Sequence, residues 1–514
     1  MTNMISPSVD WTMLLTSARA LVPEAFGSDG QPLNLIMGEW GHPGHGRPFH
    51  SAVDGTTLGN YPMLDLETAR KAVHFAAEEF TGWSKVDLDT RRAKVAECTA
   101  LIKQHRELIG KLLMWEIGKA YATAMTDVDR CVSGVEWYLD NIEPMMAGRK
   151  PLGLISNIAS WNYPLSVLMH AVLVQLLAGN PVIAKTPTDG GIFSLTVCMA
   201  LARRCGLPVS LASGSGGQLS EALVRNPDIA CLAFVGGKSN GRDIAASLYD
   251  RNKRYMLEME GVNAYGVWEF SDWDNLSKQI KKGYDYGKQR CTAYVRFVVQ
   301  RRLFPKFLDA YLPVLKSLKV GNPTVVKSAD DPLPTLDFGP LINNRKTEEL
   351  RVMESEALGM GAVTLYEGEI AESLVLPGQD TSAYMPPIAL MNIPRNSRIY
   401  HNEPFGPLDT IIVVDRVEEL IAEMNISNGS LVSSIACDDA KVVQQIAGDL
   451  RSFKVGTNNV RSRGDREEVF GGIGQSWKGC FVGGRYLVQS VTVGGEGDRL
   501  YGNFPDYTLL PEVR

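Results

Sequence analysis

The sequence predicts a doubly wound α/β fold that is divided into two or three packed units. Short apolar strands alternate with helices along most of the chain, a pattern typical of parallel sheets with helices on both faces. Polar segments with glycines follow two of these strands, as at ligand-binding strand ends. The length of 514 residues is too great for one ordinary domain.

The order of elements supports this fold. The first sixty residues are rich in loop-forming residues, and an amphipathic helix is predicted from Asp65, where apolar residues recur at helical spacing. Two more helical stretches follow between Thr90 and Lys119. Alternation then begins, and it continues in the second half of the chain. The predicted strands are 152–159, 181–185, 229–237, 410–415 and 433–439, and the predicted helices are 164–179, 191–206 and 242–252.

Composition excludes several classes of function. Hydrophobic residues make up 45% of the chain, charged residues 21%, and the net charge is −6, which is ordinary for a globular enzyme. The basic residues are scattered, so nucleic acid is not an expected partner. The most apolar stretch, 171–179, is too short to cross a bilayer, and the N-terminus does not resemble a signal peptide. The histidines at 42, 45 and 50 match no standard ligand spacing, so we expect no metal.

The eight cysteines are dispersed and form no CxxC pair, so a disulfide framework is not expected and a reducing cytoplasm fits best. Cys198 and Cys231 lie in apolar segments, as buried space-filling cysteines do. Cys291 differs, because it lies in GKQRCTAYVR (287–296) directly after Arg290. A basic neighbour favours the thiolate, so this setting favours a nucleophile over a space-filling sulfur.

Two strand ends could together bind a dinucleotide. FVGGKSNG (234–241) lies between a predicted strand and a helix, whose N-terminus attracts phosphate, although such glycine pairs are often only turns. AKTPTDGG (184–191) supplies a second polar strand end, and the two together predict a cleft. The candidate cofactor-binding residues are Lys185, Thr188, Gly236, Gly237, Lys238 and Gly241.

Three further residues each allow two interpretations. Glu258 is either an exposed loop acid or a general base that activates water. Asn162, in ASWNYPLSV (159–167), either forms a turn or donates an amide N–H to an oxyanion. Glu403, in HNEPFGPL (401–408), is either a solvated acid or a ligand of a ribose.

Taken in order, these motifs resemble the NAD(P)⁺-dependent aldehyde dehydrogenase family. Trp-Asn-Tyr-Pro comes first, then the strand ending in Lys185, the Phe-x-Gly-Gly turn and Glu258. Cys291 follows 33 residues later, and then come Glu-x-Phe-Gly-Pro, Asn459 and FGGIGQS. The resemblance covers nearly the whole chain. It is nearest in motif to the branch with non-phosphorylating glyceraldehyde-3-phosphate dehydrogenases, in which an Arg precedes the Cys.

The resemblance implies a Rossmann-type cofactor domain, an α/β catalytic domain and a small oligomerisation element. The implied cofactor domain comprises 1–130 and 151–260, and the catalytic domain 261–470. The oligomerisation element comprises 131–150 and 484–514.

The resemblance also implies a role for each motif. Cys291 would attack the aldehyde, and Asn162 and the Cys291 N–H would hold the oxyanion of the thiohemiacetal. Glu258 would activate the water that hydrolyses the thioester to a carboxylic acid. The residues that would hold the ribose hydroxyls and pack near the nicotinamide are Lys185, Glu403 and Phe405.

The charges of a few side chains predict which substrate and which cofactor are preferred. Arg290, Arg461 and Arg463 favour a polar or anionic aldehyde such as a semialdehyde, unless the last two are loop arginines with carboxylate partners. Thr188 stands where NAD⁺-preferring members often carry a Glu, so NADP⁺ is favoured and NAD⁺ is a second cofactor. Asp189 is the counter-argument, since a carboxylate in the cleft would repel a 2′-phosphate.

The sequence departs from the family at several points. Glu260 replaces a small residue near the implied nicotinamide site, and Gly237 replaces a Ser of the phosphate turn. A relay pair of the family is replaced by Ala171 and the run 479–484. The segment 137–154 is too short for the usual hairpin between subunits, whereas 486–495 is predicted to be the strand used in assembly. We therefore expect a homodimer rather than a tetramer.

Two alternatives stay open at this point. The first is a CoA-acylating aldehyde dehydrogenase, against which Glu258 argues, because such enzymes need no activated water. The second is a catalytically weak member with a structural or binding role, which Glu260, Gly237 and the missing relay favour. Retention of Cys291, Glu258 and Asn162 argues against the second alternative.

Overall fold

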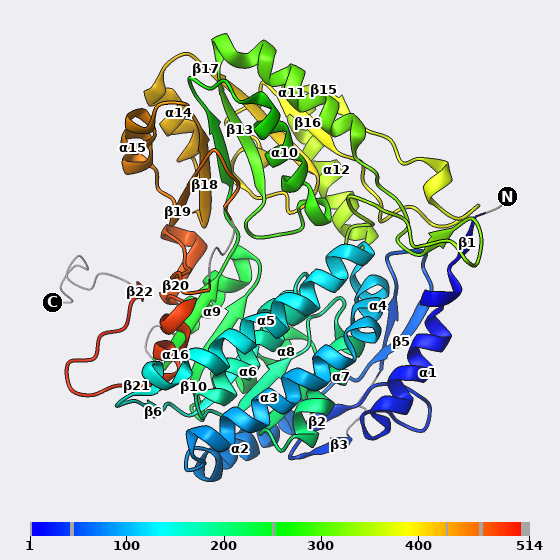
Figure 1. Ribbon diagram of the computed structural model, residues 1–514, viewed down its shortest axis with the longest axis vertical. Coiled ribbons are helices and arrows are strands. Elements are labelled where there is room, and N and C mark those ends of the chain that lie inside the picture. Colours follow the sequence, from blue (N-terminus) through cyan, green and yellow to red (C-terminus); the bar gives the residue numbers. More distant parts are fainter. Residues whose placement is uncertain are drawn as a thin grey trace.

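The fold consists of two large sheets, each in its own lobe (Figure 1). The computed structural model describes residues 3–41, 46–248, 251, 253–427, 430–461 and 466–504. Among these residues, nine strands form the first sheet and seven form the second. This arrangement agrees with the prediction of more than one α/β unit.

The first sheet has the order β22-β20-β11-β10-β7-β8-β9-β2-β3, and its five central strands are parallel. Most of their apolar residues are buried, as expected of parallel strands covered by helices. The central strands are β7 (Leu154–Ile158), β8 (Val182–Lys185), β9 (Val209–Ala212), β10 (Ile229–Val235) and β11 (Arg254–Glu258). The antiparallel edges are β2 (Asn34–Ile36), β3 (Glu39–Gly41), β20 (Trp477–Cys480) and β22 (Gly502–Asn503).

Helices cover this sheet and contribute most of its apolar core. Asp65 caps the predicted amphipathic helix, with its carboxylate accepting from the Thr68 N–H at 2.8 Å. A helix at 11–21 lies within the segment expected to be loop-rich. The helices of this lobe are α1 (Trp11–Leu21), α2 (Leu66–Trp83), α3 (Leu88–Gln104), α4 (Arg106–Ile117), α5 (Tyr121–Met146), α6 (His170–Leu177), α7 (Ile192–Arg204), α8 (Gly216–Leu223) and α9 (Lys238–Leu248).

The second sheet has the order β15-β16-β17-β13-β12-β18-β19, and all its strands except β15 are parallel. Its strands are β12 (Asn263–Val267), β13 (Tyr294–Gln300), β15 (Val363–Glu367), β16 (Ile388–Met391), β17 (Leu408–Val414), β18 (Val432–Ala436) and β19 (Lys454–Thr457). Its helices are α10 (Trp273–Gly283), α11 (Phe304–Ser317), α12 (Asn344–Gly359), α13 (Arg398–His401), α14 (Val417–Met424) and α15 (Ala440–Asp449).

Short antiparallel strand pairs lie outside the large sheets. β1 (Met4–Ile5) pairs with β14 (Val325–Val326), so the N-terminal segment lies against the second lobe. β4 (Arg47–His50) and β5 (Thr57–Tyr61) form a hairpin.

The expected assembly strand is only partly a strand. Residues Gly484–Ser490 form helix α16, and only β21 (Thr492–Val493) is extended, where it pairs with β6 (Lys150–Pro151). The prediction of a strand over 486–495 is therefore wrong for its first half. Leu487 and Val488 are buried in the core of the first lobe, and the Tyr138 hydroxyl donates to the Gly484 carbonyl at 2.8 Å. These contacts with α5 and the core favour the helix.

Candidate functional site

Cys291 lies on the loop between a short helical segment (Asp285–Lys288) and β13. All eight cysteines are free; the other seven are buried, whereas Cys291 is partly exposed. The polar sequence around this residue therefore corresponds to a thiol that is open to a cavity.

The backbone before Cys291 is strained. Tyr286 and Lys288 have φ values of 59° and 60°, a left-handed region that residues other than glycine adopt rarely. Two buried contacts hold this conformation. The Tyr286 hydroxyl donates to the Ile117 carbonyl of the first lobe at 2.7 Å, and the Lys288 ammonium pairs with Asp409 on β17.

Asp409 accepts hydrogen bonds from three side chains. Besides Lys288, it accepts hydrogen bonds from the hydroxyls of Tyr284 and Tyr311, each at 2.7 Å. Lys288 and Asp409 are almost completely buried, at 1% and 0% exposure of their side chains. Burial lowers the pKa of Lys288, and the neighbouring Asp409 carboxylate acts in the opposite direction. The network fixes the loop that carries Cys291.

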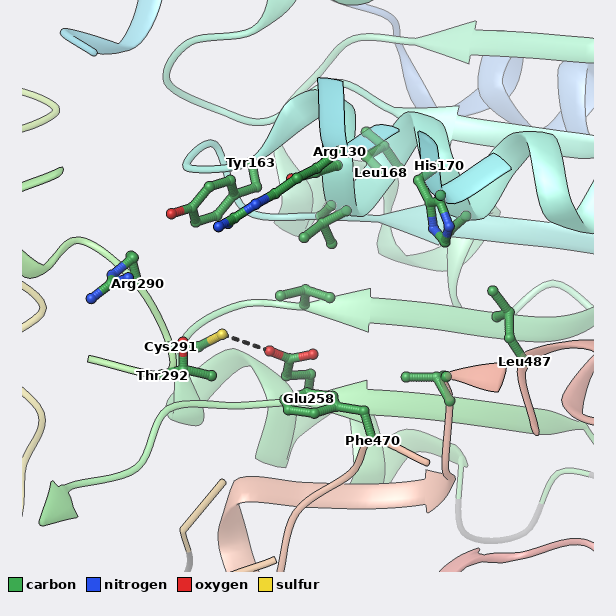
Figure 2. Close-up of a pocket in the computed structure, with 18 of the residues that line it drawn as sticks. Arg130, Tyr163, Leu168, His170, Glu258, Arg290, Cys291, Thr292, Phe470 and Leu487 are labelled. Atoms are coloured by element: carbon green, nitrogen blue, oxygen red, sulfur yellow. Dashed lines mark hydrogen bonds between the residues drawn. The ribbon is translucent and has the colours of Figure 1, made fainter. Parts of the chain in front are cut away.

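Glu258 is the last residue of β11 and is 1% exposed, so it is not the exposed loop acid that one interpretation allowed. Its Oε1 accepts from the Cys291 thiol at 2.8 Å (Figure 2). The acid comes from the first lobe and the thiol from the loop that leads into the second sheet. Packing of the two lobes therefore brings the two groups into contact.

Asn162 lies between β7 and a π-helical turn (Pro164–Met169) and is 6% exposed. Its amide nitrogen donates to the Gln289 carbonyl, two residues before Cys291, at 3.0 Å. An amide group has two N–H donors, so one such contact leaves a second donor for a ligand. Trp161 meets Phe405 edge-on, with ring centroids 5.8 Å apart.

The thiol opens into a cavity of about 480 Å³. Figure 2 shows Cys291 and Glu258 on one side of it and Tyr163, Arg130 and His170 on the opposite side. Burial raises the pKa of Tyr163 to about 12. The charged side chains that line the cavity are Arg130, Lys282, Arg290, Arg461, Arg466, Glu258, Asp285 and Glu468.

The predicted substrate arginines have different environments. The Arg290 guanidinium donates to the Gly283 carbonyl at 2.9 Å and lines the cavity beside Cys291. Arg461 also lines the cavity, but it pairs with Glu468, as expected of a loop arginine with a carboxylate partner. Arg463 lies outside the described residues.

Arg130 was not found from the sequence. It lies on α5 and lines the cavity, and with Arg290 and Lys282 it contributes positive charge around Asp285. A signal was present, because Asp127, Arg130 and Gly134 are spaced so as to share one helical face.

Lys185 ends β8 and is 4% exposed. Burial, reinforced by the nearby positive charge of Arg47, lowers its pKa to about 8. The Arg47 guanidinium also donates to the backbone carbonyl of the exposed Thr188. Asp189 forms ion pairs with Arg47 at 3.7 Å and Arg345 at 3.3 Å. Its carboxylate is therefore partly neutralised; neither arginine was predicted from the sequence.

The predicted glycine turn joins β10 to α9. The Gly236 N–H donates to the Glu258 carbonyl at 3.1 Å, and a Cβ at Gly237 would meet none of the described atoms within 4 Å. Gly241 has no such room, since a Cβ there would lie 2.4 Å from the side chain of Met259. The turn therefore has open space beside Gly237 and is closely packed against Met259 at Gly241.

Glu403 is 4% exposed and lies near the turn. Its Oε2 accepts from the Gly261 N–H at 3.3 Å, whereas its Oε1 has no hydrogen-bond partner in the described part of the chain. Burial, together with the negative charge of Glu260, raises the pKa of Glu403 well above its usual range. Buried polar atoms normally have partners, so Glu403 and Lys185 could hold hydroxyl groups of a ligand. Phe405 follows with a φ of 50°.

No group of three or more His, Cys, Asp or Glu side chains in the described ranges could hold a metal ion. No helix in the part of the chain that the structure describes is long and apolar enough to cross a membrane.

Comparison with known proteins shows the family to which the chain belongs. The family model described as the aldehyde dehydrogenase family matches residues 44–493. The chain belongs to the aldehyde dehydrogenase family. This membership makes it an NAD(P)-dependent oxidoreductase.

Two relatives share about a quarter of their residues with this chain. A 2-aminomuconic semialdehyde dehydrogenase of Homo sapiens is 27% identical over 79% of this chain and 85% of the relative. An NADP-dependent glyceraldehyde-3-phosphate dehydrogenase of Pisum sativum is 26% identical over 89% of this chain and 92% of the relative. The crystal structure of an NADP-dependent glyceraldehyde-3-phosphate dehydrogenase from Bacillus halodurans C-125, complexed with NADP, has a TM-score of 0.80 and 23% identity, covering 90% of this chain and 98% of that one. The predicted fold class is confirmed.

Replacing Asp409 by alanine is expected to destabilise this aldehyde dehydrogenase by about 3–5 kcal/mol, because the Lys288 ammonium would stay buried without its carboxylate. Asp415→Ala is the control: it removes a carboxylate that pairs with Arg301 on the exposed surface, and it should leave stability nearly unchanged. Urea unfolding followed by circular dichroism measures both variants. Equal, small effects would contradict the structural role of Asp409.

Proposed function

We propose that the protein oxidises a polar or anionic aldehyde to a carboxylic acid, with NADP⁺ favoured as the cofactor and NAD⁺ accepted. The observation that carries this proposal is the 2.8 Å contact between the Cys291 thiol and the Glu258 carboxylate, beside a cavity lined by basic side chains. A thiol needs a base to become a strong nucleophile, and a buried acid in direct contact can accept its proton.

The chain's own residues account for the protein-side steps of such a reaction. Cys291 gives its proton to Glu258, and the thiolate attacks the carbonyl carbon to form a thiohemiacetal. The second amide N–H of Asn162 and the Cys291 N–H donate to the oxyanion. When bound, the nicotinamide cofactor supplies a hydride acceptor. The thiohemiacetal carbon loses a hydride and becomes a thioester. After Glu258 has passed the proton of Cys291 to bulk water, it takes a proton from the water that attacks the thioester, and the carboxylic acid leaves as the Cys291 thiolate is released.

The residues near the turn fit a dinucleotide. The orphaned Oε1 of Glu403 would accept from a ribose hydroxyl near the nicotinamide, where Phe405 would pack, and Lys185 would donate to the adenosine ribose. Gly236, Gly237 and Gly241, with Lys238, would bring the N-terminus of α9 to the phosphates.

Preference for NADP⁺ is supported by charge around Thr188. The hydroxyl of Thr188 replaces a carboxylate, and the carboxylate of Asp189 is paired with two arginines. A 2′-phosphate would therefore meet less repulsion than Asp189 alone would cause. The NADP-dependent relatives support the same preference.

Arg130, Arg290 and Lys282 support an anionic aldehyde, because these three cationic side chains lie close to Asp285, with Asp337 as a second nearby acid. A carboxylate or phosphate on the substrate would gain charge-assisted hydrogen bonds there. We also propose Arg461 and Arg463 as substrate-binding residues. For Arg461, this requires that its ion pair with Glu468 breaks when the substrate binds. The semialdehyde and glyceraldehyde-3-phosphate dehydrogenases among the relatives act on substrates of this kind by name.

We also propose a cytoplasmic homodimer with the three units predicted from the sequence. Eight free cysteines suit a reducing compartment. The β6–β21 pair, in which Val493 is 44% exposed, supports assembly through 131–150 and 484–514. The cofactor domain would comprise 1–130 and 151–260, and the catalytic domain 261–470.

A panel of aldehydes tests the proposed function. Succinic semialdehyde and glyceraldehyde-3-phosphate should yield NADPH faster than hexanal and benzaldehyde, with or without CoA. Cys291→Ala should abolish turnover while leaving NADP⁺ binding intact, because only the nucleophile is lost. Turnover that requires CoA would indicate acyl transfer to CoA, and wild-type turnover by Cys291→Ala would exclude the cysteine mechanism.

Glu258→Gln is expected to slow hydrolysis of the thioester more than its formation, because glutamine cannot take a proton from water. A pre-steady-state burst of NADPH should then appear or grow in stopped-flow absorbance. Equal slowing of the burst and the steady state would assign Glu258 a different role.

Thr188→Glu should shift the ratio of kcat/KM for NADP⁺ over kcat/KM for NAD⁺ toward NAD⁺ by about tenfold or more, since charge-assisted contacts are worth roughly 1.5–3 kcal/mol. Thr188→Gln is the matched neutral control and should shift the ratio far less. A wild-type protein that strongly favours NAD⁺ would contradict the preference and indicate that Asp189 still selects against the 2′-phosphate.

A further inference from the structure

Glu260 caps the helix that follows the glycine turn. Its Oε1 accepts from the backbone N–H of Lys238, the first residue of α9, at 3.2 Å. The Glu260 carbonyl is itself held by the Ser476 hydroxyl at 3.1 Å, and the next residue, Gly261, donates to Glu403. The carboxylate is thus held at the N-terminal end of an 11-residue helix.

The N-terminus of a helix attracts carboxylates and phosphates alike, because both are anions that accept hydrogen bonds. The first N–H groups have no partner within the helix, and the helix dipole adds partial positive charge there. An N–H that donates to Glu260 is not available to a phosphate oxygen at the same time. A carboxylate from the chain and a phosphate from a ligand therefore compete for this position.

A second observation indicates that a ligand belongs beside this helix end. Glu403 is 4% exposed, and its Oε1 lacks a partner among the described residues. Its carboxyl group lies close enough to Glu260 for that charge to raise its pKa. The space above Gly237 is open as well. An unsatisfied buried oxygen and a free volume thus flank the Glu260 carboxylate.

The charges around Glu260 indicate how the electrostatics would change if its carboxylate moved away from α9. Lys238 and Lys346 both stabilise its negative charge, whereas burial raises its pKa and Glu349 adds repulsion. If the carboxylate moved away, the Lys238 ammonium would lose a nearby negative charge and attract another anion, whereas Lys346 would keep Glu349 as its partner at 3.1 Å. If it stayed, a diphosphate would add negative charge beside Glu258, Glu260 and Glu403.

We propose that Glu260 determines the affinity for the dinucleotide: its carboxylate caps α9 in the free protein and must leave before a diphosphate can bind there. This inference rests on the proposed function, because it requires that the chain binds NADP⁺ or NAD⁺ at α9. It assigns Glu260 an effect on cofactor affinity, not a role in the chemical step.

Isothermal titration of the full chain with NADP⁺ tests the inference without turnover. Glu260→Gln keeps the shape and removes the charge, and Glu260→Gly removes the side chain. Both should lower the Kd by about tenfold, the scale expected when a competing charge leaves a helix N-terminus. Glu348→Gln is the control, because it makes the same charge change at an exposed position on α12 and should alter the Kd by less than about twofold.

A second ligand separates the diphosphate from the rest of the cofactor. Adenosine 2′-phosphate carries no diphosphate, so its Kd should be the same in the wild type and in Glu260→Gln. Tighter binding of both ligands would contradict competition at α9 and indicate a general charge effect.

The remaining outcomes distinguish this inference from the proposed function. Wild-type binding of NADP⁺ with an unchanged or higher Kd in both Glu260 variants overturns the inference alone. Failure of the wild type and both variants to bind overturns the proposed function as well. Binding by the variants alone supports the inference in its strongest form, in which the cap closes the site.

Discussion

The buried ion pair between Lys288 and Asp409 is the constraint on which the geometry of the site depends. Removing two charges from water is unfavourable, and the arrangement is stable only because each charge has several partners. Lys288 donates to Asp409 and to the Tyr294 carbonyl, and Asp409 accepts from two tyrosine hydroxyls as well. This network holds the backbone of Lys288 at positive φ, and the position of Cys291 follows from that conformation.

The contact between Cys291 and Glu258 also depends on how the lobes pack. Glu258 has its place because β11 is paired on both sides, with β10 and β20. Cys291 belongs to the segment before β13, which is anchored to the first lobe by the contacts of Tyr286 with Ile117 and of Asn162 with Gln289. A change in these interlobe contacts would separate the thiol from the acid without altering either residue. The proposed chemistry is thus a property of the interface between the lobes.

Sequence patterns predicted what is local and missed what joins distant segments. The strands near 154, 182 and 229 were predicted within about two residues because buried parallel strands are continuous apolar runs. The polar setting of Cys291 distinguished it from the buried cysteines. Arg47, Arg130 and the partner of Lys288 were not predicted, since their significance arises from residues 100 or more positions away. Only the order of the family motifs carried long-range information.

The start of α9 shows how such distant contacts alter local structure. The sequence placed the helix at 242–252, because Gly-Gly-Lys-Ser-Asn-Gly is typical of a turn, yet the helix begins at Lys238. The Glu260 carboxylate, from a loop 22 residues later, satisfies the first N–H of that helix. Glu260 was recognised as a departure from the family, but its contact with α9 could not be inferred from its own neighbours.

Three carboxyl groups near the turn have different environments, and each environment suits a different role. Glu258 faces a thiol, Glu260 faces a helix N-terminus, and Glu403 is buried with one oxygen unsatisfied. Burial raises the pKa of both Glu260 and Glu403, and for Glu403 the neighbouring charge raises it further. Like charges near each other disfavour simultaneous ionisation, so the negative charge of Glu260 favours the protonated form of Glu403. A protonated Glu403 is both a donor and an acceptor, which suits a sugar hydroxyl better than a carboxylate that only accepts.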